Sequence, residues 1–357
     1  MGCIQSSSES CVVFCAAISL VSCLPNDTRP IPGSLEVTVT ADPLVLGGTP
    51  SVSTVDGWTV TYDRFMISIS ASLDGDTTCS SYYNDGYRRI LDMGVPGPQK
   101  VNLLYALGHC DFGFRVASTT PDPYLPLGRG VTMADENLMG AAGADPYTTD
   151  RNGKPQPTGV ALYARGRATK DGDTKTFTWE FRRRISYQNC AAPLNPGDAG
   201  PAGDTGAVES IGDSGESGSI RDAGDDGNAA DAGPRGPQGV DLASREAKTV
   251  DIRIHGESLF LDSTNAAEGR LRFDFLAAAD DKYGNGDGDI ALSELGLVPL
   301  TDIGLARRYV QAPGDLTAAA PAMSAWTTLE DFVYLGLFPK VSRFENGGTC
   351  DTNLRGR

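Results

Sequence analysis

Residues 160–181 read VALYARGRATKDGDTKTFTWEF, and this stretch decides the expected fold class. Every second residue is apolar along two arms: Val160, Leu162 and Ala164 on the first, and Phe177, Trp179 and Phe181 on the second. A period of two is typical of a strand that buries one face. Asp171-Gly172 lies between the arms, and Asp-Gly is a strong signal for a two-residue hairpin turn. The stretch therefore predicts a β-hairpin with one apolar face.

The same alternation predicts strands on both sides of the hairpin, in residues 34–40, 58–73, 111–116 and 250–254. Within 58–73 the phase slips between Tyr62 and Phe65, which predicts a bulge or a bend. Apolar residues at helical spacing are confined to short stretches: 133–139, 259–260, 269–280 and 328–337. We expect a mainly β protein with a smaller α part (α+β), namely an antiparallel β-sandwich-like body followed by C-terminal helices.

Two local features refine this expectation. Thr327 and Glu330 have the spacing of a capping box, with Thr327 as N-cap and Glu330 at the third helical position. Arg182, Arg183 and Arg184 form the only basic cluster of the chain. We interpret this cluster as an exposed strand end, and the alternative is a binding site for an anionic lipid or polysaccharide.

The charge balance limits the possible partners. The 357 residues carry a formal net charge of −16, and the pI is about 4.5. Such a polyanion is a poor partner for nucleic acid, whose phosphates require Lys and Arg clusters. His109 and His255 are the only histidines, which excludes a zinc centre with three imidazole ligands.

Residues 191–240 differ in composition from the rest of the chain. Glycine recurs there at every third position, and the phase continues through Glu209, Arg221 and Ala230. The tract resembles a decayed collagen-like repeat, but it contains few prolines and nine acidic residues against two basic ones. It has too little apolar surface to offset its ordering entropy. We expect a disordered acidic linker or insertion; a trimerising collagen stalk is the alternative.

The N-terminus predicts export. Residues 12–21 form an uncharged apolar run that is too short to span a bilayer and fits a signal-peptide core. Leu20-Val21-Ser22-Cys23 resembles the bacterial lipobox, in which the cysteine is acylated. We therefore expect a signal peptide over 1–23, lipid on Cys23 and a tether over 24–33. The protein would then belong to the bacterial cell envelope, as an outer-membrane lipoprotein or a periplasmic protein. Cleavage without lipid is one alternative, and myristoylation at Met1-Gly2-Cys3 on a cytosolic membrane face is another.

Four dispersed cysteines favour the exported alternatives. These are Cys79, Cys110, Cys190 and Cys350. No two of them form a CxxC pair, so the spacing typical of a zinc site is absent. An even set of separated cysteines in an exported chain indicates two disulfides. Three connectivities are possible, and we favour the sequential pairing of Cys79 with Cys110 and of Cys190 with Cys350. The body would comprise a β-rich domain over 34–190 and an α/β segment over 241–357, packed on each other.

Residues 285–295 read NGDGDIALSEL and resemble an EF-hand calcium loop. Placing Ile290 at position 8 sets Asn285 at 3, Asp287 at 5, Gly288 at 6, Asp289 at 7 and Glu294 at 12. Short oxygen ligands and a closing glutamate suit the hard Ca²⁺ ion. Position 1 is Tyr283, which is no carboxylate, so Asp280 or Asp281 would supply the missing oxygen. We predict one structural Ca²⁺ on Asp281, Asn285, Asp287, Asp289 and Glu294; a merely polar turn is the alternative.

Several segments carry a family resemblance: HGESLFLDS (255–263), LRF (271–273), NGDG (285–288), LSEL (292–295), GHCDFGF (108–114) and FTW (177–179). Together they resemble uncharacterised exported lipoproteins of myxobacterial type with a C-terminal calcium loop. The resemblance implies a place in the cell envelope and a β-rich architecture, and it implies no reaction.

Catalytic motifs are missing from the sequence. It contains no HExxH, no GxSxG elbow, no Walker A loop and no GxGxxG after a strand. We expect His255 to be a structural histidine, and Cys110 to be disulfide-bonded rather than paired with His109 for catalysis. A non-enzymatic lipoprotein is the leading hypothesis. The alternatives are a glycan- or metal-handling module using Tyr82, Tyr83, Tyr87 or Arg182–Arg184, and a carboxylate-based hydrolase.

Overall fold

The computed structural model describes residues 30–74, 78–83, 88–118, 127–149, 154–192, 238–264, 269–301, 326–345 and 348–353. The chain divides into two units, Met1–Ile31 and Pro32–Arg357, and the description below concerns the second. The predicted signal peptide with Cys23 lies outside the described residues, as does most of the glycine-rich tract. Among the described residues, no helix has the length and apolar character needed to cross a bilayer.

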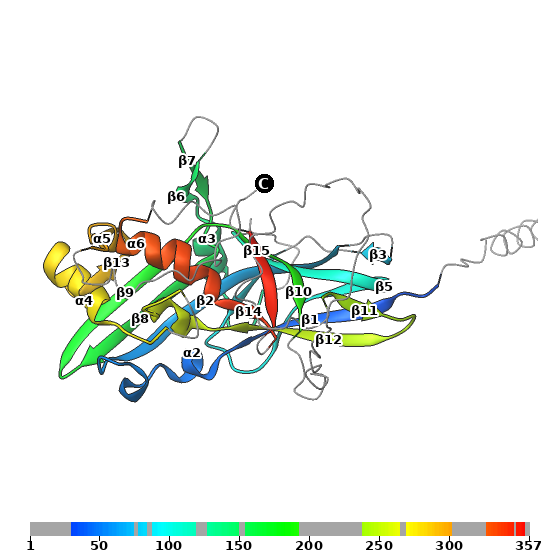
Figure 1. The fold of residues 1–357 in the computed structure, drawn as a ribbon, viewed down its shortest axis with the longest axis horizontal. Coiled ribbons are helices and arrows are strands. Elements are labelled where there is room, and N and C mark those ends of the chain that lie inside the picture. The colour runs from blue at the N-terminus through cyan, green and yellow to red at the C-terminus, as the bar shows by residue number, and fades with distance from the viewer. Residues whose placement is uncertain are drawn as a thin grey trace, which may run out of the picture. The chain divides into compact units, whose positions relative to one another are not determined.

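Within the described ranges, thirteen strands join in one curled sheet (Figure 1). They are β1 (Gly33–Ala41), β2 (Thr59–Asp74), β3 (Cys79–Tyr83), β4 (Arg89–Asp92), β5 (Gln99–Val116), β8 (Leu162–Lys170), β9 (Asp173–Phe181), β10 (Ile185–Ala191), β11 (Val240–Leu242), β12 (Ala247–Ile254), β13 (Asp289–Ala291), β14 (Ser342–Phe344) and β15 (Thr349–Asn353). The main path runs β13-β9-β8-β2-β5-β1-β12-β14. A separate ribbon consists of β6 (Gly143–Thr149) and β7 (Pro155–Thr158).

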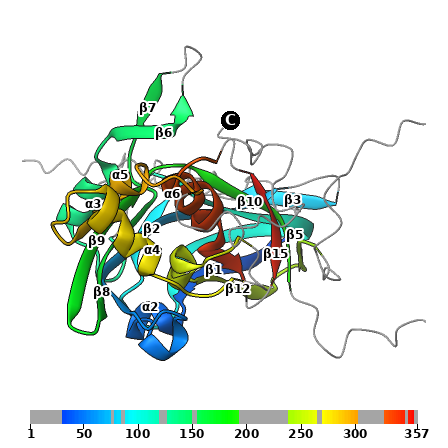
Figure 2. The same ribbon diagram turned by 60° about the vertical axis from the view of Figure 1, so that its left-hand side comes forward.

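The helical elements are short. Among the described residues, the α-helices are α2 (Pro43–Gly47), α3 (Met133–Gly140), α4 (Asp274–Ala278), α5 (Leu292–Leu295) and α6 (Leu329–Asp331). Single turns of 3-10 helix are formed by Ser51–Ser53, Gly256–Phe260 and Phe338–Lys340, and π-helical turns by Ala279–Tyr283 and Phe332–Leu337. In Figures 1 and 2, α4, α5 and α6 lie beside the β8–β9 hairpin. The expected mainly β class with a smaller α part is confirmed.

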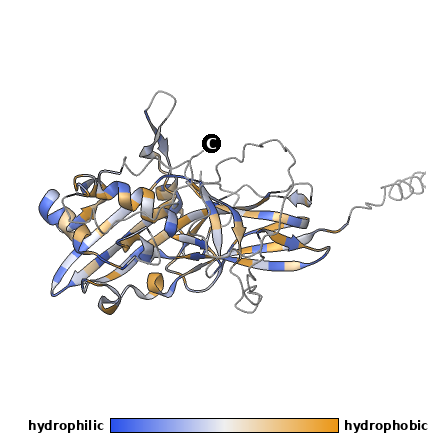
Figure 3. Cartoon of the chain, in the orientation of Figure 1, coloured by the Kyte–Doolittle hydropathy of each residue, from blue (hydrophilic) through white to orange (hydrophobic). Residues whose placement is uncertain are grey.

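The predicted hairpin is β8 and β9, paired in register from Leu162↔Phe181 to Lys170↔Asp173. Asp171 and Gly172 both have positive φ, 51° and 94°, as a primed hairpin turn requires. Apolar and polar residues alternate along the long strands, as the banding in Figure 3 shows. The phase slip in β2 is a bulge, because its pairing with β8 shifts register between Tyr62 and Arg64.

The sheet is mixed, whereas an antiparallel body was expected. β12 runs parallel to β1 over eight residue pairs, and β13 runs parallel to β9. A parallel pair needs a long crossover connection, and the chain between β1 and β12 supplies one. The segment 241–357 therefore contributes strands to the same sheet as residues 34–190.

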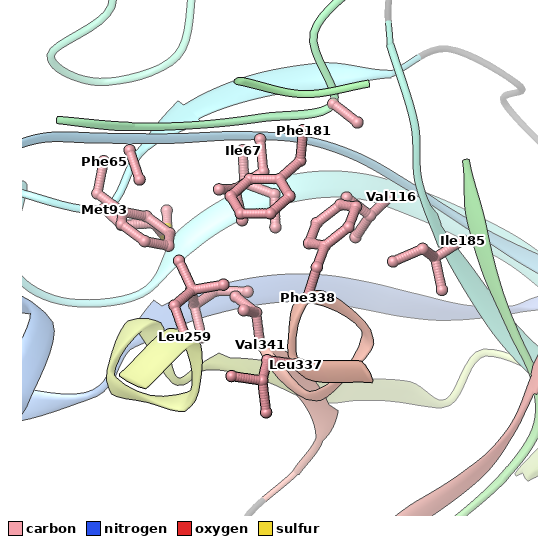
Figure 4. Packing of buried hydrophobic residues seen from close by; sticks show 14 of the residues in the cluster. Phe65, Ile67, Met93, Val116, Phe181, Ile185, Leu259, Leu337, Phe338 and Val341 are labelled. Carbon is pink, nitrogen blue, oxygen red and sulfur yellow. The ribbon is translucent and has the colours of Figure 1, made fainter. Parts of the chain in front are cut away.

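The core joins the apolar face of the hairpin to the C-terminal helical turns. Phe181 stacks on Phe338 with ring centroids 4.7 Å apart, and Figure 4 shows both rings in the same buried cluster as Val116 and Ile185. Trp179 lies 6.0 Å from Phe260 by the same measure. Burial of aromatic rings is among the largest favourable contributions to folding. The hairpin and the helical turns are thus stabilised as one unit.

The cysteines pair in the favoured sequential order. Cys79 bonds to Cys110 and joins β3 to β5, and Cys190 bonds to Cys350 and joins β10 to β15. The second disulfide attaches the last described strand to the sheet.

Two helix starts differ from the sequence-based expectation. Leu271 lies in β-bridges to Thr54 and Leu261, so the helix expected over 269–280 begins only at Asp274. The Asp56 carboxylate accepts the N–H groups of Phe273 and Asp274 at 2.6 and 2.8 Å, and this cap comes from a distant segment.

The C-terminal capping box is shifted by one residue from its expected place. Thr328 is the N-cap and Asp331 is the third helical residue, in place of Thr327 and Glu330. The Asp331 Oδ2 also accepts the Thr327 N–H at 2.8 Å and the Thr327 hydroxyl at 3.4 Å, in addition to the Thr328 N–H, so three adjacent polar groups converge on this carboxylate.

The arginine cluster is not the exposed strand end that we expected. Arg183 is buried. Arg182 donates to the carbonyls of Ala141 and Thr158 and pairs with Glu180. The Arg182 guanidinium binds neighbouring backbone because Arg182 follows directly on the buried end of β9. The expectation of an exposed strand end is therefore wrong for Arg183.

Candidate functional site

The loop predicted to bind calcium is attached to the hairpin through β13. Ile290 pairs with Phe177 in register and is fully buried. The indole N–H of Trp179 donates to the Ile290 carbonyl at 2.9 Å. The aliphatic residue at position 8 is therefore a core residue that fixes the loop on the sheet.

The loop curls through two turns stabilised by its own side chains. The Asn285 Oδ1 accepts the Asp287 N–H at 2.9 Å, and the Asp287 Oδ1 accepts the Asp289 N–H at 2.8 Å. Gly286 and Gly288 have φ values of 70° and 88°, which favour glycine. Short side chains thereby place three oxygen-bearing residues along one tight turn.

Glu294 closes the loop from its C-terminal side. Its two carboxylate oxygens accept the N–H groups of Asn285 at 3.2 Å and of Ala291 at 3.1 Å. A Cβ at Gly284 would lie only 2.4 Å from the Glu294 Oε1, so a larger residue at this position would displace the carboxylate.

The structure selects Asp280 rather than Asp281 as the carboxylate beside the loop. Asp281 is 60% exposed and pairs with Lys175 at 2.5 Å. Asp280 is fully buried, and its Oδ2 accepts the Lys175 ammonium at 2.7 Å and the Gly288 N–H at 3.0 Å. Its Oδ1 is buried and has no hydrogen-bond partner. Asp280 is thus a buried carboxylate that bonds to the loop through its Oδ2 and has one further oxygen that accepts no hydrogen bond.

The electrostatics of Asp280 favour its charged form. Burial raises its pKa, but the hydrogen bond and charge of Lys175 and the amides of Gly288 and Gly286 outweigh that effect, so the pKa lies below its ordinary value. Asp289 has a different partner, because its Oδ1 accepts the Thr176 hydroxyl at 2.7 Å. The predicted ligands therefore lie around one loop, with Asp289 bonded to β9.

A second cluster combines a histidine with two carboxylates. One ligand atom each of Asp42, His255 and Glu257 lies within 4.8 Å of the other two. Among the described residues, this is the group of three or more His, Cys, Asp or Glu side chains that meets this criterion. The His255 Nδ1 is 2.9 Å from the Glu257 Oε1 and 3.6 Å from the Asp42 Oδ2. The sequence analysis treated His255 as structural and missed this cluster, because Asp42 is more than two hundred positions away in the chain.

A polar pocket of about 260 Å³ lies over β2, β5 and β10. Its walls include Ser70, Ser72, Arg115, Ser186 and Gln188. The pKa values of the nearby Arg88 and Arg184 are lowered, mainly by burial and secondly by the positive charge of Arg115. The Nε atoms of these two arginines are buried without a hydrogen-bond acceptor. The cluster is therefore chemically suited to an anionic group.

Other predicted site residues are kept apart. Cys110 is in a disulfide, and His109 pairs with Asp241 at 2.8 Å on the surface. Tyr82 is 37% exposed, whereas Tyr87 and the side chain of Tyr83 lie outside the described residues. No catalytic Cys–His pair is formed by these residues.

No protein-family model, curated protein or solved structure matches this chain. The candidate sites are therefore interpreted from their own geometry and chemistry.

Proposed function

We propose that this chain is an exported, membrane-anchored lipoprotein of non-enzymatic type, in which residues 280–294 hold one structural Ca²⁺. The observation that carries the ion proposal is the buried Asp280 carboxylate with its unpartnered Oδ1 beside the loop. Lys175 compensates the charge of this carboxylate, but a buried oxygen that accepts no hydrogen bond is costly, and a cation bound to Oδ1 would offset that cost.

The donor set suits a hard cation. Asp280, Asn285, Asp287 and Glu294 offer oxygen atoms, which Ca²⁺ prefers, and no sulfur or nitrogen ligand. In this assignment Asp280 replaces Tyr283 at the first position, and Glu294 exchanges its backbone N–H partners for the ion. The ion would stabilise the junction between the loop and the β8–β9 hairpin, which is a structural role.

Thermal unfolding of chelator-treated protein with and without Ca²⁺ tests this role. A ligand at a hundredfold excess over its Kd stabilises the folded state by about 2.7 kcal/mol, so we expect a clear rise in Tm for the wild type. Asp280→Asn and Glu294→Gln should abolish the rise. Asp281→Asn is the matched control and should retain it. An unchanged wild-type Tm at millimolar Ca²⁺ would sink the proposal.

The membrane anchor rests on the lipobox-like Leu20-Val21-Ser22-Cys23 and on the two disulfides, which are typical of an oxidising compartment. Metabolic labelling with a palmitate analogue in a bacterial host should label the wild type. Cys23→Ala should remove the label, and Cys15→Ala should keep it. Equal labelling of wild type and Cys23→Ala would exclude lipid on Cys23.

A second candidate function, an anionic-glycan module, is favoured by the pocket with Arg115. We expect the protein to retain sulfated or carboxylated glycans on an array, and Arg115→Ala to lower the signal at least tenfold. Arg167→Ala is the control, because Arg167 is exposed and pairs with Asp63 at 3.1 Å away from the pocket. Equal signals from both variants would refute this candidate.

A further inference from the structure

The topology brings Asp42 and His255 together at one edge of the sheet. β1 ends at Ala41 and β12 ends at Ile254, and these two residues are partners in the parallel pairing. Asp42 and His255 are the next residues of the two strands. The carboxyl ends of adjacent parallel strands are recurrent places for binding sites, because the side chains that follow them lie next to each other.

The backbone around the cluster is held on all sides. The Asp42 N–H donates to Ile254 at 2.8 Å, and the His255 N–H donates to Val341 at 2.7 Å. Gly256 lies against Tyr62 and Phe65, where an added Cβ would approach both rings to about 3 Å, and the Tyr62 hydroxyl donates to the Gly256 carbonyl at 2.8 Å. These contacts fix the 3-10 turn that carries Glu257.

The charges of the cluster are not balanced. Across the described residues, neither Asp42 nor Glu257 pairs with a lysine or arginine, and His255 is their shared partner. Even a protonated imidazole leaves the group with a net charge of −1. The Glu257 Oε2 is buried and has no hydrogen-bond partner, and its side chain is only 15% exposed. The group therefore lacks positive charge and one donor.

The spacing of the three ligand atoms suits a small cation. Tetrahedral ligands at bond lengths of about 2.0–2.2 Å lie roughly 3.3–3.6 Å from one another. The two separations from the His255 Nδ1 are 2.9 and 3.6 Å. With its proton on Nε2, the imidazole presents the Nδ1 lone pair to both carboxylates, and one nitrogen with two oxygens suits Zn²⁺ or a similar divalent transition cation.

We propose that Asp42, His255 and Glu257 form a binding site for a divalent transition cation of the Zn²⁺ type, separate from the calcium loop. Asp42 keeps its Oδ1 as the acceptor of the Leu44 N–H at 3.0 Å, which orients its Oδ2 toward the site. The three side chains are between 15% and 25% exposed, so the site opens to solvent on one side. Water or a ligand group of a partner completes the coordination there.

Zinc titration of the full chain tests the proposal, with Ca²⁺ kept in excess so that the loop does not compete. The wild type should bind Zn²⁺ tightly at one site, and Co²⁺ in its place should give visible absorption bands of a low-symmetry site. His255→Gln and Glu257→Gln should weaken Zn²⁺ binding by about 100-fold or more. His109→Gln is the matched control, because it removes the other histidine of the chain.

The zinc affinities of the variants decide whether the site exists. Loss of tight binding in His255→Gln with retention in His109→Gln supports the site. Wild-type protein without tight Zn²⁺ binding overturns it, as does His255→Gln that binds as tightly as the wild type. Asp42→Asn and Glu257→Gln, which keep side-chain shape, decide the question if circular dichroism shows that His255→Gln is unfolded. A Ca²⁺ loop that fails its own test leaves this result unaffected.

Discussion

Trp179→Ala is expected to destabilise the folded protein by about 3–5 kcal/mol, the usual range for removing a fully buried large aromatic side chain. Trp179 has no exposed surface and contacts Phe177, Phe181 and Phe260. The change also leaves the buried Ile290 carbonyl without its donor. Urea unfolding followed by circular dichroism measures the loss as a lower midpoint.

Trp179→Phe separates the two contributions. It keeps an aromatic ring in the core but removes the indole N–H, so it should cost about 1–3 kcal/mol, the range for an unsatisfied buried acceptor together with a smaller ring. Thr174→Ala at the exposed side of the same strand is the control and should change stability little. A Trp179→Ala variant as stable as this control would contradict the packing described for the hairpin.

Removal of the Cys190–Cys350 disulfide should be the other large effect. Its cysteines are 160 positions apart, and a chain-entropy estimate gives a stabilisation of about 5 kcal/mol. The Cys79–Cys110 disulfide spans 31 positions, for which the same relation gives roughly 1.5 kcal/mol less. The double variant Cys190→Ala/Cys350→Ala should therefore unfold at lower urea concentration than Cys79→Ala/Cys110→Ala.

The two double variants serve as controls for each other, because each removes one pair of cysteines from one pair of strands. Among the described strands, β15 pairs with β10 alone, so loss of the Cys190–Cys350 bond should also release the C-terminal strand to hydrogen exchange. Equal midpoints, or a larger loss on removal of Cys79–Cys110, would contradict the assignment of greater stabilisation to the C-terminal disulfide.

The local elements of the fold were predictable where a short pattern determines the structure. The hairpin follows from apolar alternation and from Asp171-Gly172, and both arms occur as expected. The bulge in β2 follows from a phase slip between Tyr62 and Phe65. Such patterns report which face is buried, and burial of that face dominates the local energetics.

Long-range pairing was not predictable in the same way. Nothing in the alternation of β1 specifies that β12, more than two hundred residues later, lies parallel to it. The start of α4 depends on Asp56 in another segment, and Arg182 after β9 binds the carbonyls of Ala141 and Thr158. Register and partner choice arise from the whole core, so a single strand does not contain them.

The two candidate metal sites differ in the same way, because one is formed by a local sequence motif and the other by residues far apart in the chain. The calcium loop is local, so its residues could be proposed from spacing, although the choice between Asp280 and Asp281 required the burial of Asp280. The cluster at Asp42, His255 and Glu257 joins two distant strand ends. The sequence offered only the His255-x-Glu257 spacing as a signal, and that spacing is common by chance.

Calorimetric titration of Ca²⁺ into chelator-treated protein tests the central claim most directly. We predict one binding event per chain for the wild type and for Asp281→Asn, and no heat of binding for Asp280→Asn or Glu294→Gln. Absence of heat for the wild type at millimolar Ca²⁺, or unchanged binding in Glu294→Gln, would contradict the claim that residues 280–294 hold a calcium ion.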